Sequence, residues 1–161
     1  DLIPADDLVV PLFIIDIAAR AEVQASCAVT PDDIAAFEKK NGPIPEGCCV
    51  AMHSGWARHV RTAKYRNADA QGKMHFPGWH VECAHALLER KVTGLGVDTL
   101  SIDMGPTETF DTHYAWLPTG RWAIEGLANL DQLPATGATI VLGAPKIAGA
   151  TGGPTRVFAL I

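Results

Sequence analysis

The chain has 161 residues, of which 48% are hydrophobic and 19% charged, and its formal net charge at pH 7 is −5. This length is sufficient for a domain with its own core, and the composition excludes an intrinsically disordered chain. The acidic balance provides no basic surface for nucleic acid, and no apolar run reaches the ~18 residues of a transmembrane helix. We therefore expect a single domain over residues 1–161, with neither nucleic acid nor membrane as a partner.

The four cysteines, Cys27, Cys48, Cys49 and Cys83, form neither a C-x-x-C pair nor a regular framework. This usage is typical of small buried thiols in a reducing compartment, which favours a cytoplasmic location. The first residue is Asp1 instead of Met, and the chain opens almost directly into an apolar run. We therefore expect this chain to be the C-terminal part of a longer protein.

The first half of the chain alternates strand and helix signals. The β-branched, continuously apolar run at 8–17 predicts a buried strand. Thr30 and Pro31 are typical of a helix start, and Asn41-Gly42 of a helix end. A second strand is predicted at 48–53, because this run is short and apolar and follows a proline- and glycine-rich turn.

The second half continues the alternation. A helix is predicted at 81–91 and a strand at 92–98, followed by a turn-rich loop. We expect a helix to end at 128–133, and two last strands at 138–142 and 156–161. Strands that alternate with helices predict an α/β domain with a mixed or parallel sheet.

The stretch 94–130 concentrates the chemistry of the chain. A strand ends in polar residues that include Asp103, an acid-flanked loop delivers His113, and Glu125 follows twelve residues later. An imidazole and a carboxylate beside a strand end are groups from which α/β proteins build metal or acid–base sites. We predict His113 and Glu125 as site residues. Two groups do not complete a zinc or manganese site, so further ligands must come from distant or upstream residues.

Two other kinds of site are weighed against this one. The segment Gly94–Thr99 is faintly similar to a dinucleotide fingerprint, but it forms a strand instead of following one, and its third position is not glycine. Ser54 and Ser101 lie outside the G-x-S-x-G pattern of hydrolases. A triad of either serine with His113 and Asp103 remains open, since such triads are defined in space.

Several segments together resemble a known family. In chain order they are the strand LFIIDI, the turn IPEGCCVAMHSGW, HFPG, GLGVDTLSID, the histidine of FDTHYAWL, the glutamate of IEGLANLDQLP and the closing GGPTRVFAL. Their order and spacing resemble the cyclase-like metal-dependent hydrolases, which include bacterial kynurenine formamidase and isatin hydrolase. HFPG, the Gly-Trp turn and the GGP-x-R segment are more similar to the branch that contains isatin hydrolase.

The resemblance implies a swivelling β/β/α domain, an α/β fold in which helices flank a mixed sheet, and a homodimer or higher homo-oligomer. The family's metal site begins with an H-x-x-x-H-x-D motif, which this chain does not contain. The remaining ligands are therefore expected upstream of Asp1. In two-metal members, a histidine and a glutamate twelve residues apart help to hold the second metal. These positions match His113 and Glu125, and the implied cofactor is a divalent metal, Mn or Zn.

The implied reaction is hydrolysis of an amide C–N bond, cyclic in isatin and formyl in N-formylkynurenine. Both substrates are flat aromatic ketones, so the resemblance implies an aromatic-lined pocket. The candidates for its lining are Trp56, His75, Phe76, Trp79 and Trp116, although each aromatic residue is equally compatible with a core position. The first hypothesis is hydrolysis of isatin or a related aromatic cyclic amide. The alternatives are an N-formylkynurenine formamidase and a catalytically inactive fragment that retains only the fold and an oligomer interface.

Overall fold

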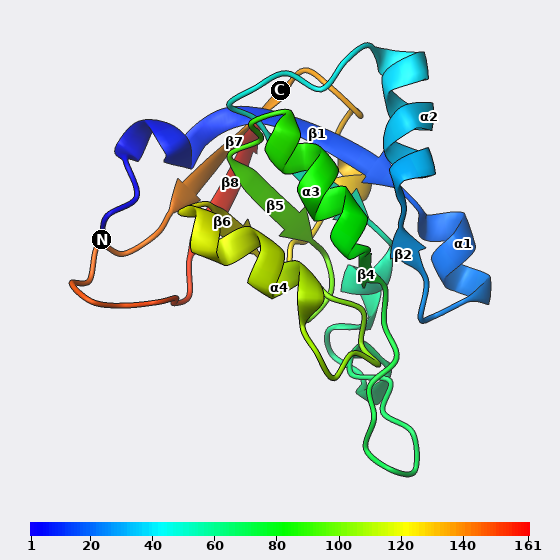
Figure 1. Ribbon diagram of the computed structural model, residues 1–161. Helices are drawn as coiled ribbons and strands as arrows, with labels where there is room; N and C mark the ends of the chain where they lie inside the picture. The colour runs from blue at the N-terminus through cyan, green and yellow to red at the C-terminus, as the bar shows by residue number, and fades with distance from the viewer.

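A six-stranded mixed sheet organises the structure, a computed structural model that describes residues 1–161 (Figure 1). Its strands are β1 (Val9–Asp16), β3 (Cys49–His53), β5 (Gly94–Val97), β6 (Trp122–Ile124), β7 (Ala138–Gly143) and β8 (Arg156–Leu160). The order across the sheet is β6-β5-β3-β1-β7-β8, and the first four of these strands are parallel while β7 and β8 join antiparallel. The α/β fold with a mixed sheet is therefore confirmed.

The helices and a small second sheet complete the chain. The α-helices are α1 (Ala18–Val23), α2 (Pro31–Asn41), α3 (Val81–Glu89) and α4 (Asp111–Trp116). Short 3-10 helices lie at Ala5–Leu8, Trp56–His59, Ala63–Tyr65, Leu117–Thr119 and Leu130–Gln132. The strands β2 (Ala28–Val29) and β4 (Gly78–Trp79) pair in parallel as a separate two-stranded sheet. None of these helices has the length and apolar character needed to cross a membrane.

Helix α2 begins and ends at the predicted residues. Thr30 is the N-cap, and its backbone N–H donates to the Asp33 carboxylate at 2.8 Å. Gly42 ends the helix with a left-handed φ of 89°. Local signals are sufficient here because capping and helix termination involve residues only a few positions apart.

The predictions for the region between β5 and β7 are partly wrong. His113 lies in the first turn of α4 instead of in a loop, and residues 128–133 contain only a short 3-10 helix. β5 and β6 are parallel neighbours, so the chain between them must cross back over the sheet, usually as a helix. The helix therefore lies before β6 and not after it. Helix α4 supplies this crossover, and Pro118 and Gly120 prevent its extension.

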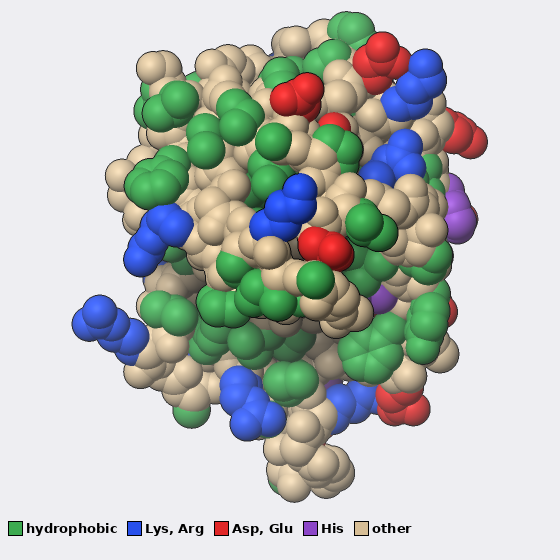
Figure 2. Space-filling model, turned by 90° about the vertical axis from the view of Figure 1, so that its left-hand side faces the viewer, with side chains coloured by type: hydrophobic (Ala, Val, Ile, Leu, Met, Phe, Trp, Pro, Cys, Tyr) green, Lys and Arg blue, Asp and Glu red, His purple; other side chains and the backbone are tan.

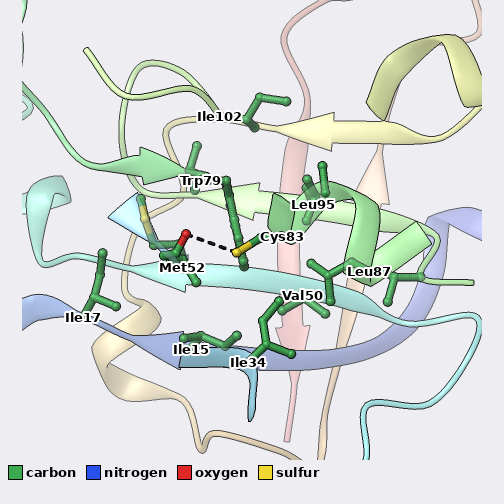
Figure 3. Packing of buried hydrophobic residues seen from close by; sticks show 14 of the residues in the cluster. Ile15, Ile17, Ile34, Val50, Met52, Trp79, Cys83, Leu87, Leu95 and Ile102 are labelled. Carbon is green, nitrogen blue, oxygen red and sulfur yellow. Dashed lines mark hydrogen bonds between the residues drawn. The ribbon is translucent and has the colours of Figure 1, made fainter. Parts of the chain in front are cut away.

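Buried residues occupy both faces of β1, as its continuous apolar run predicts. Ile15 joins a core in which Trp79 and Leu87 also lie, beneath α2 and α3 (Figure 3). Leu12 and Ile14 point to the opposite face, where the apolar cluster contains no residue from an α-helix. The sheet is thus covered by helices on one face and by the segment after β6 on the other.

All four cysteines are free and buried, which confirms the prediction of small buried thiols. Burial raises the pKa of the Cys48 thiol to about 12. Cys83 is a buried residue of α3, and its sulfur donates to the carbonyl oxygen of Val29 in β2 at 3.1 Å (Figure 3). These thiols act as small apolar groups of the core.

Outside the core, a cavity with a volume of about 460 Å³ lies between β8 and the segment after β6. Phe158 and Leu160 of β8 are 58% and 60% exposed. Figure 2 shows one side of the molecule, on which hydrophobic side chains lie exposed among scattered charged ones. Most of the residues that line this cavity are hydrophobic, and Glu125 also lines part of it.

Candidate active site

Titratable side chains mark the carboxyl edge of the four parallel strands. Asp16 and His53 end β1 and β3, and their side chains approach to 3.4 Å. Asp98 directly follows β5, and Glu125 directly follows β6. Because parallel strands end at one edge of a sheet, residues far apart in the sequence come together there.

Asp98 acts as an anchor for the Ser54–Trp56 turn. It is 1% exposed, and its carboxylate accepts hydrogen bonds from the backbone N–H of Ser54 and Trp56 and from the Ser54 hydroxyl. The bond from the Ser54 hydroxyl is 2.5 Å long. Ser54 is therefore occupied by a structural carboxylate and has no histidine partner.

Asp103 holds His113 at the start of α4. The carboxylate is buried and accepts hydrogen bonds from the backbone N–H groups of Thr112 and His113, at 2.8 and 3.1 Å. It also lies 2.5 Å from Nδ1 of the His113 ring. The helix thus receives at its N-terminus a negative charge from a residue outside the helix, and the same charge orients the imidazole.

The backbone that presents Asp103 is held by the Phe76-Pro77-Gly78 turn. The N–H of Trp79 donates to the carbonyl of Ile102 at 2.7 Å. A Cβ on Gly78 would lie 2.3 Å from the Asp103 carbonyl carbon, so no other residue fits there. The HFPG segment therefore fixes the position of the strand-end carboxylate.

The second nitrogen of His113 faces Glu125. Nε2 and the Glu125 Oε1 are 3.5 Å apart, and the same oxygen accepts from the N–H of Ile102 at 3.3 Å. Hydrogen bonding to Asp103, then to Glu125, raises the pKa of His113 to about 9 against the opposing effect of burial. Burial acts to raise the pKa of Asp103, but the hydrogen bonds from His113 and Thr112 outweigh it and the pKa of Asp103 is lowered. A cationic ring between two carboxylates results.

A cavity of about 290 Å³ opens beside this ring. His113 and Glu125 form its polar side, and its apolar lining includes Phe76 and Phe110. The Phe110 ring stands edge-on to the imidazole, with ring centroids 5.9 Å apart. The larger cavity near β8 shares only Glu125 with this one. We therefore place the candidate site in the cavity of about 290 Å³, where His113 and Glu125 both lie next to apolar side chains.

The donor set partly fits a divalent metal. A carboxylate on Nδ1 that leaves Nε2 free is the usual support of a metal-binding histidine, and a carboxylate oxygen of Glu125 lies on the Nε2 side. Within residues 1–161, however, no three His, Cys, Asp or Glu side chains are grouped to hold a metal ion. His113 and Glu125 would therefore provide at most two ligands of such a site, and the other ligands would have to come from elsewhere.

The other predicted pocket residues lie in different places. Phe76 lines the cavity and is 2% exposed. Trp56 and Trp79 are buried, and their indole N–H groups donate to the carbonyls of Tyr65 and Gly96. Trp116 is also buried in the core beneath α3 and α4.

His75 does not face the cavity, because its ring contacts Ser26 and Asp69 instead. Ser101 lines the cavity, and its Oγ accepts the N–H of Asp103. The roles of Trp56, His75, Phe76 and Trp79 in substrate binding stay predictions.

Two residues of this site were not among the predicted site residues. The sequence predicts Asp103 only as a possible triad partner, although its position at a strand end is a usable signal. Phe110 had no signal of its own, because it is an aromatic residue in an irregular loop. Its place beside His113 depends on a left-handed backbone turn at the start of α4.

The chain belongs to the Cyclase family, described as "Putative cyclase", whose model matches residues 1–104. It is similar to an isatin hydrolase of Roseibium aggregatum, with 31% identity over the whole chain and 63% of that protein. The chain therefore spans less than two thirds of this relative's length.

Solved structures give the same relationship. Isatin hydrolase A from Labrenzia aggregata, bound to benzyl benzoate, matches 98% of this chain and 62% of its own, with 38% identity and a TM-score of 0.93. An isatin hydrolase bound to the product analogue thioisatinate matches all of this chain and 63% of its own, with 30% identity and a TM-score of 0.95. A potential metal-dependent hydrolase with cyclase activity matches 97% of this chain and 67% of its own, with 26% identity and a TM-score of 0.70.

Proposed function

We propose that this chain supplies part of the active site of a metal-dependent amidohydrolase that cleaves the C–N bond of an aromatic cyclic amide such as isatin. The observation that supports this most is the Asp103–His113–Glu125 arrangement beside a cavity of about 290 Å³. The likeness to isatin hydrolases suggests the substrate. Because the chain spans about 63% of such a relative, the activity is proposed for the whole protein that contains it.

His113 and Glu125 are proposed to hold a divalent cation, Mn or Zn, together with ligands that this chain does not provide. Such a cation, when bound, acts as a Lewis acid on the amide carbonyl and lowers the pKa of a bound water. Asp103 would keep the His113 Nδ1–H directed at itself, so that the Nε2 lone pair is available.

The apolar walls of the cavity are proposed to select the substrate. Phe76 and Phe110 offer aromatic surfaces next to His113, and a flat aromatic ring can pack against such surfaces. The same walls would accept the aromatic ring of N-formylkynurenine, so the formamidase alternative is tested alongside. The two substrates differ in whether the amide is part of the ring system.

Isatin turnover by the whole protein tests the proposal. We expect hydrolysis that is lost on dialysis against a chelator and restored by Mn or Zn, with a higher kcat/KM for isatin than for N-formylkynurenine. His113→Gln and Glu125→Gln should each lower kcat/KM by roughly 10²-fold or more, since each removes a ligand. His85→Gln is a matched control, because His85 is exposed on α3. Metal-independent turnover would contradict the mechanism.

The alternative of an inactive fragment applies to the 161-residue chain by itself. This alternative is favoured because His113 and Glu125 would provide only two of the three or more protein ligands that a zinc or manganese site usually needs. We expect this isolated chain to retain little or no metal after dialysis, whereas stoichiometric Mn or Zn would contradict that expectation. A homodimer or higher homo-oligomer is also proposed, and light scattering coupled to gel filtration measures it.

A further inference from the structure

A second histidine–carboxylate assembly lies apart from the candidate active site. The Ser26 Oγ is 3.0 Å from Nδ1 of His75, and Nε2 of the same ring is 3.1 Å from an oxygen of Asp69. None of the three residues lines the cavity beside His113. We propose that Ser26, His75 and Asp69 form a serine-nucleophile triad that hydrolyses small activated esters without a metal.

The small parallel sheet brings the serine and the histidine together. β2 and β4 pair with Ala28 opposite Gly78, and the Gly78 N–H donates to the carbonyl of Cys27 at 3.2 Å. Ser26 lies two residues before the start of β2, and His75 lies three residues before the start of β4. Because paired parallel strands start at the same edge, the residues just before each strand are neighbours.

The third member is held independently of the other two. One carboxylate oxygen of Asp69 accepts the backbone N–H groups of Gln71 and Lys73, each at 2.9 Å. The other oxygen is left to face His75, whose own carbonyl accepts from the Asn67 side chain at 2.7 Å. Asp69 thus holds the imidazole ring, and Asn67 holds the backbone of the same residue.

These contacts determine which ring nitrogen carries the proton. The hydrogen bond from His75 lowers the pKa of Asp69, so that this carboxylate is ionised at neutral pH and acts only as an acceptor. Nε2 must then be the protonated nitrogen of a neutral His75 ring, and Nδ1 has the lone pair that faces Ser26. In the common serine triad, Nε2 accepts the proton of the serine and Nδ1–H donates to the aspartate. Here Nδ1 faces the Ser26 hydroxyl as the base, and Nε2–H donates to Asp69.

The chemistry of this arrangement is acyl transfer. As the Ser26 Oγ bonds to an ester carbonyl carbon, its proton moves to Nδ1 of His75. The same proton then passes to the departing alkoxide, which leaves as an alcohol, and the acyl group stays on Ser26. A water molecule repeats the sequence with His75 as base and releases the carboxylic acid.

The exposure of the assembly defines the substrate class. The side chains of His75 and Asp69 are each 35% exposed, and Ser26 is half-buried. This placement gives a small reactant access to the hydroxyl and the ring. Small esters with good leaving groups, and fluorophosphonates, fit this description.

The experiment treats the 161-residue protein with a fluorophosphonate probe in EDTA and maps the adduct by mass spectrometry. We expect the adduct on Ser26, together with slow turnover of p-nitrophenyl acetate. Ser26→Ala should remove both, and His75→Asn should slow labelling by roughly 10²-fold or more, the usual effect of losing a general base. His85→Asn is the matched control, because His85 is an exposed residue of α3, and this variant should be labelled at the rate of wild type.

A folded wild-type protein, verified by circular dichroism, that gives no adduct on Ser26 overturns the proposal. Labelling that His75→Asn leaves unchanged also overturns it, because the histidine would then have no role as base. EDTA keeps this test separate from isatin hydrolysis, so either proposal can fail without the other.

Discussion

The two histidine assemblies each contain one imidazole ring, but the groups that contact the ring differ. His113 lies between two carboxylates, Asp103 at Nδ1 and Glu125 at Nε2. His75 lies between one carboxylate and the hydroxyl of Ser26. A ring that faces two acids is favoured as a cation, or as one ligand of a cation, whereas a ring that faces a hydroxyl is placed to accept its proton.

Burial of the orienting carboxylate also separates the two assemblies. The side chain of Asp103 is 6% exposed and that of Asp69 is 35% exposed. Asp103 accepts the first N–H groups of α4, whereas Asp69 accepts N–H groups of an exposed turn. The first assembly is therefore part of what holds the domain together, and the second can be altered with little effect on the fold.

The largest expected effect is that of Asp103→Ala. This change leaves the N–H groups of Thr112 and His113 and the imidazole without their buried acceptor. Removing one partner of such a buried pair costs about 3–5 kcal/mol of the free energy of unfolding. Urea denaturation at pH 7 in EDTA measures it.

Asp69→Ala is the matched change in the exposed assembly. It should shift the urea midpoint only slightly, because the N–H groups of Gln71 and Lys73 then meet water. If Asp103→Ala and Asp69→Ala lost the same free energy of unfolding, burial of the carboxylate would not explain how much each assembly stabilises the domain.

The next effect is the contribution of His113 to the pH dependence of stability. Its pKa is raised from 6.5 to about 9 in the folded chain, by Asp103 first and Glu125 second. Its stabilisation should be fully present below pH 6.5, decline between 6.5 and about 9, and be absent above that range. A shift of this size corresponds to about 3 kcal/mol. Urea denaturation in EDTA from pH 6 to 9.5 measures the decline.

His113→Gln should flatten this pH profile, because the titrating group is gone. His75→Asn should leave the slope of wild type, since His113 and its two carboxylates are intact. A wild-type profile that is flat from pH 6.5 to 9 would contradict the raised pKa of His113.

Sequence reasoning succeeded where the signal is local. The strand at 8–17 and the α2 cap at Thr30 depend on neighbouring residues, and both are present. His113 and Glu125 were chosen by residue type and spacing, and the fold brings them to 3.5 Å.

What sequence reasoning missed depends on distant pairing. The Ser26–His75 contact results from β2 and β4, which are two residues long and too short for a strand pattern. The segment of helix α4 is predicted as a loop because its six residues are too few to show a helical pattern of apolar positions. The 2.5 Å contact of Asp103 with His113 depends on where α4 begins, so it could not be predicted before that helix was known.

The smallest expected effect concerns the backbone beside each histidine. Phe110, next to His113, has a left-handed φ of 55°, and Asn67, whose side chain supports His75, has a φ of 45°. Asparagine adopts this conformation at low cost, but a bulky residue there loses about 1 kcal/mol. Phe110 is 47% exposed, so burial does not compensate for that cost, and its ring lies in the cavity wall. We expect that phenylalanine is present at position 110, despite this strain, because its ring contacts the ligand.

Phe110→Asn should therefore raise the free energy of unfolding by about 0.5–1 kcal/mol, since asparagine adopts the left-handed conformation at a lower cost than phenylalanine. The same change should raise the KM of the whole protein for isatin by roughly 5- to 10-fold, because one aromatic contact is lost. Tyr114→Asn is the matched control, as Tyr114 is 75% exposed on α4 and lies outside the cavity lining. A Phe110→Asn protein that is less stable than wild type, or binds isatin equally well, would mean that Phe110 is kept for packing and that the strain has no function at this site.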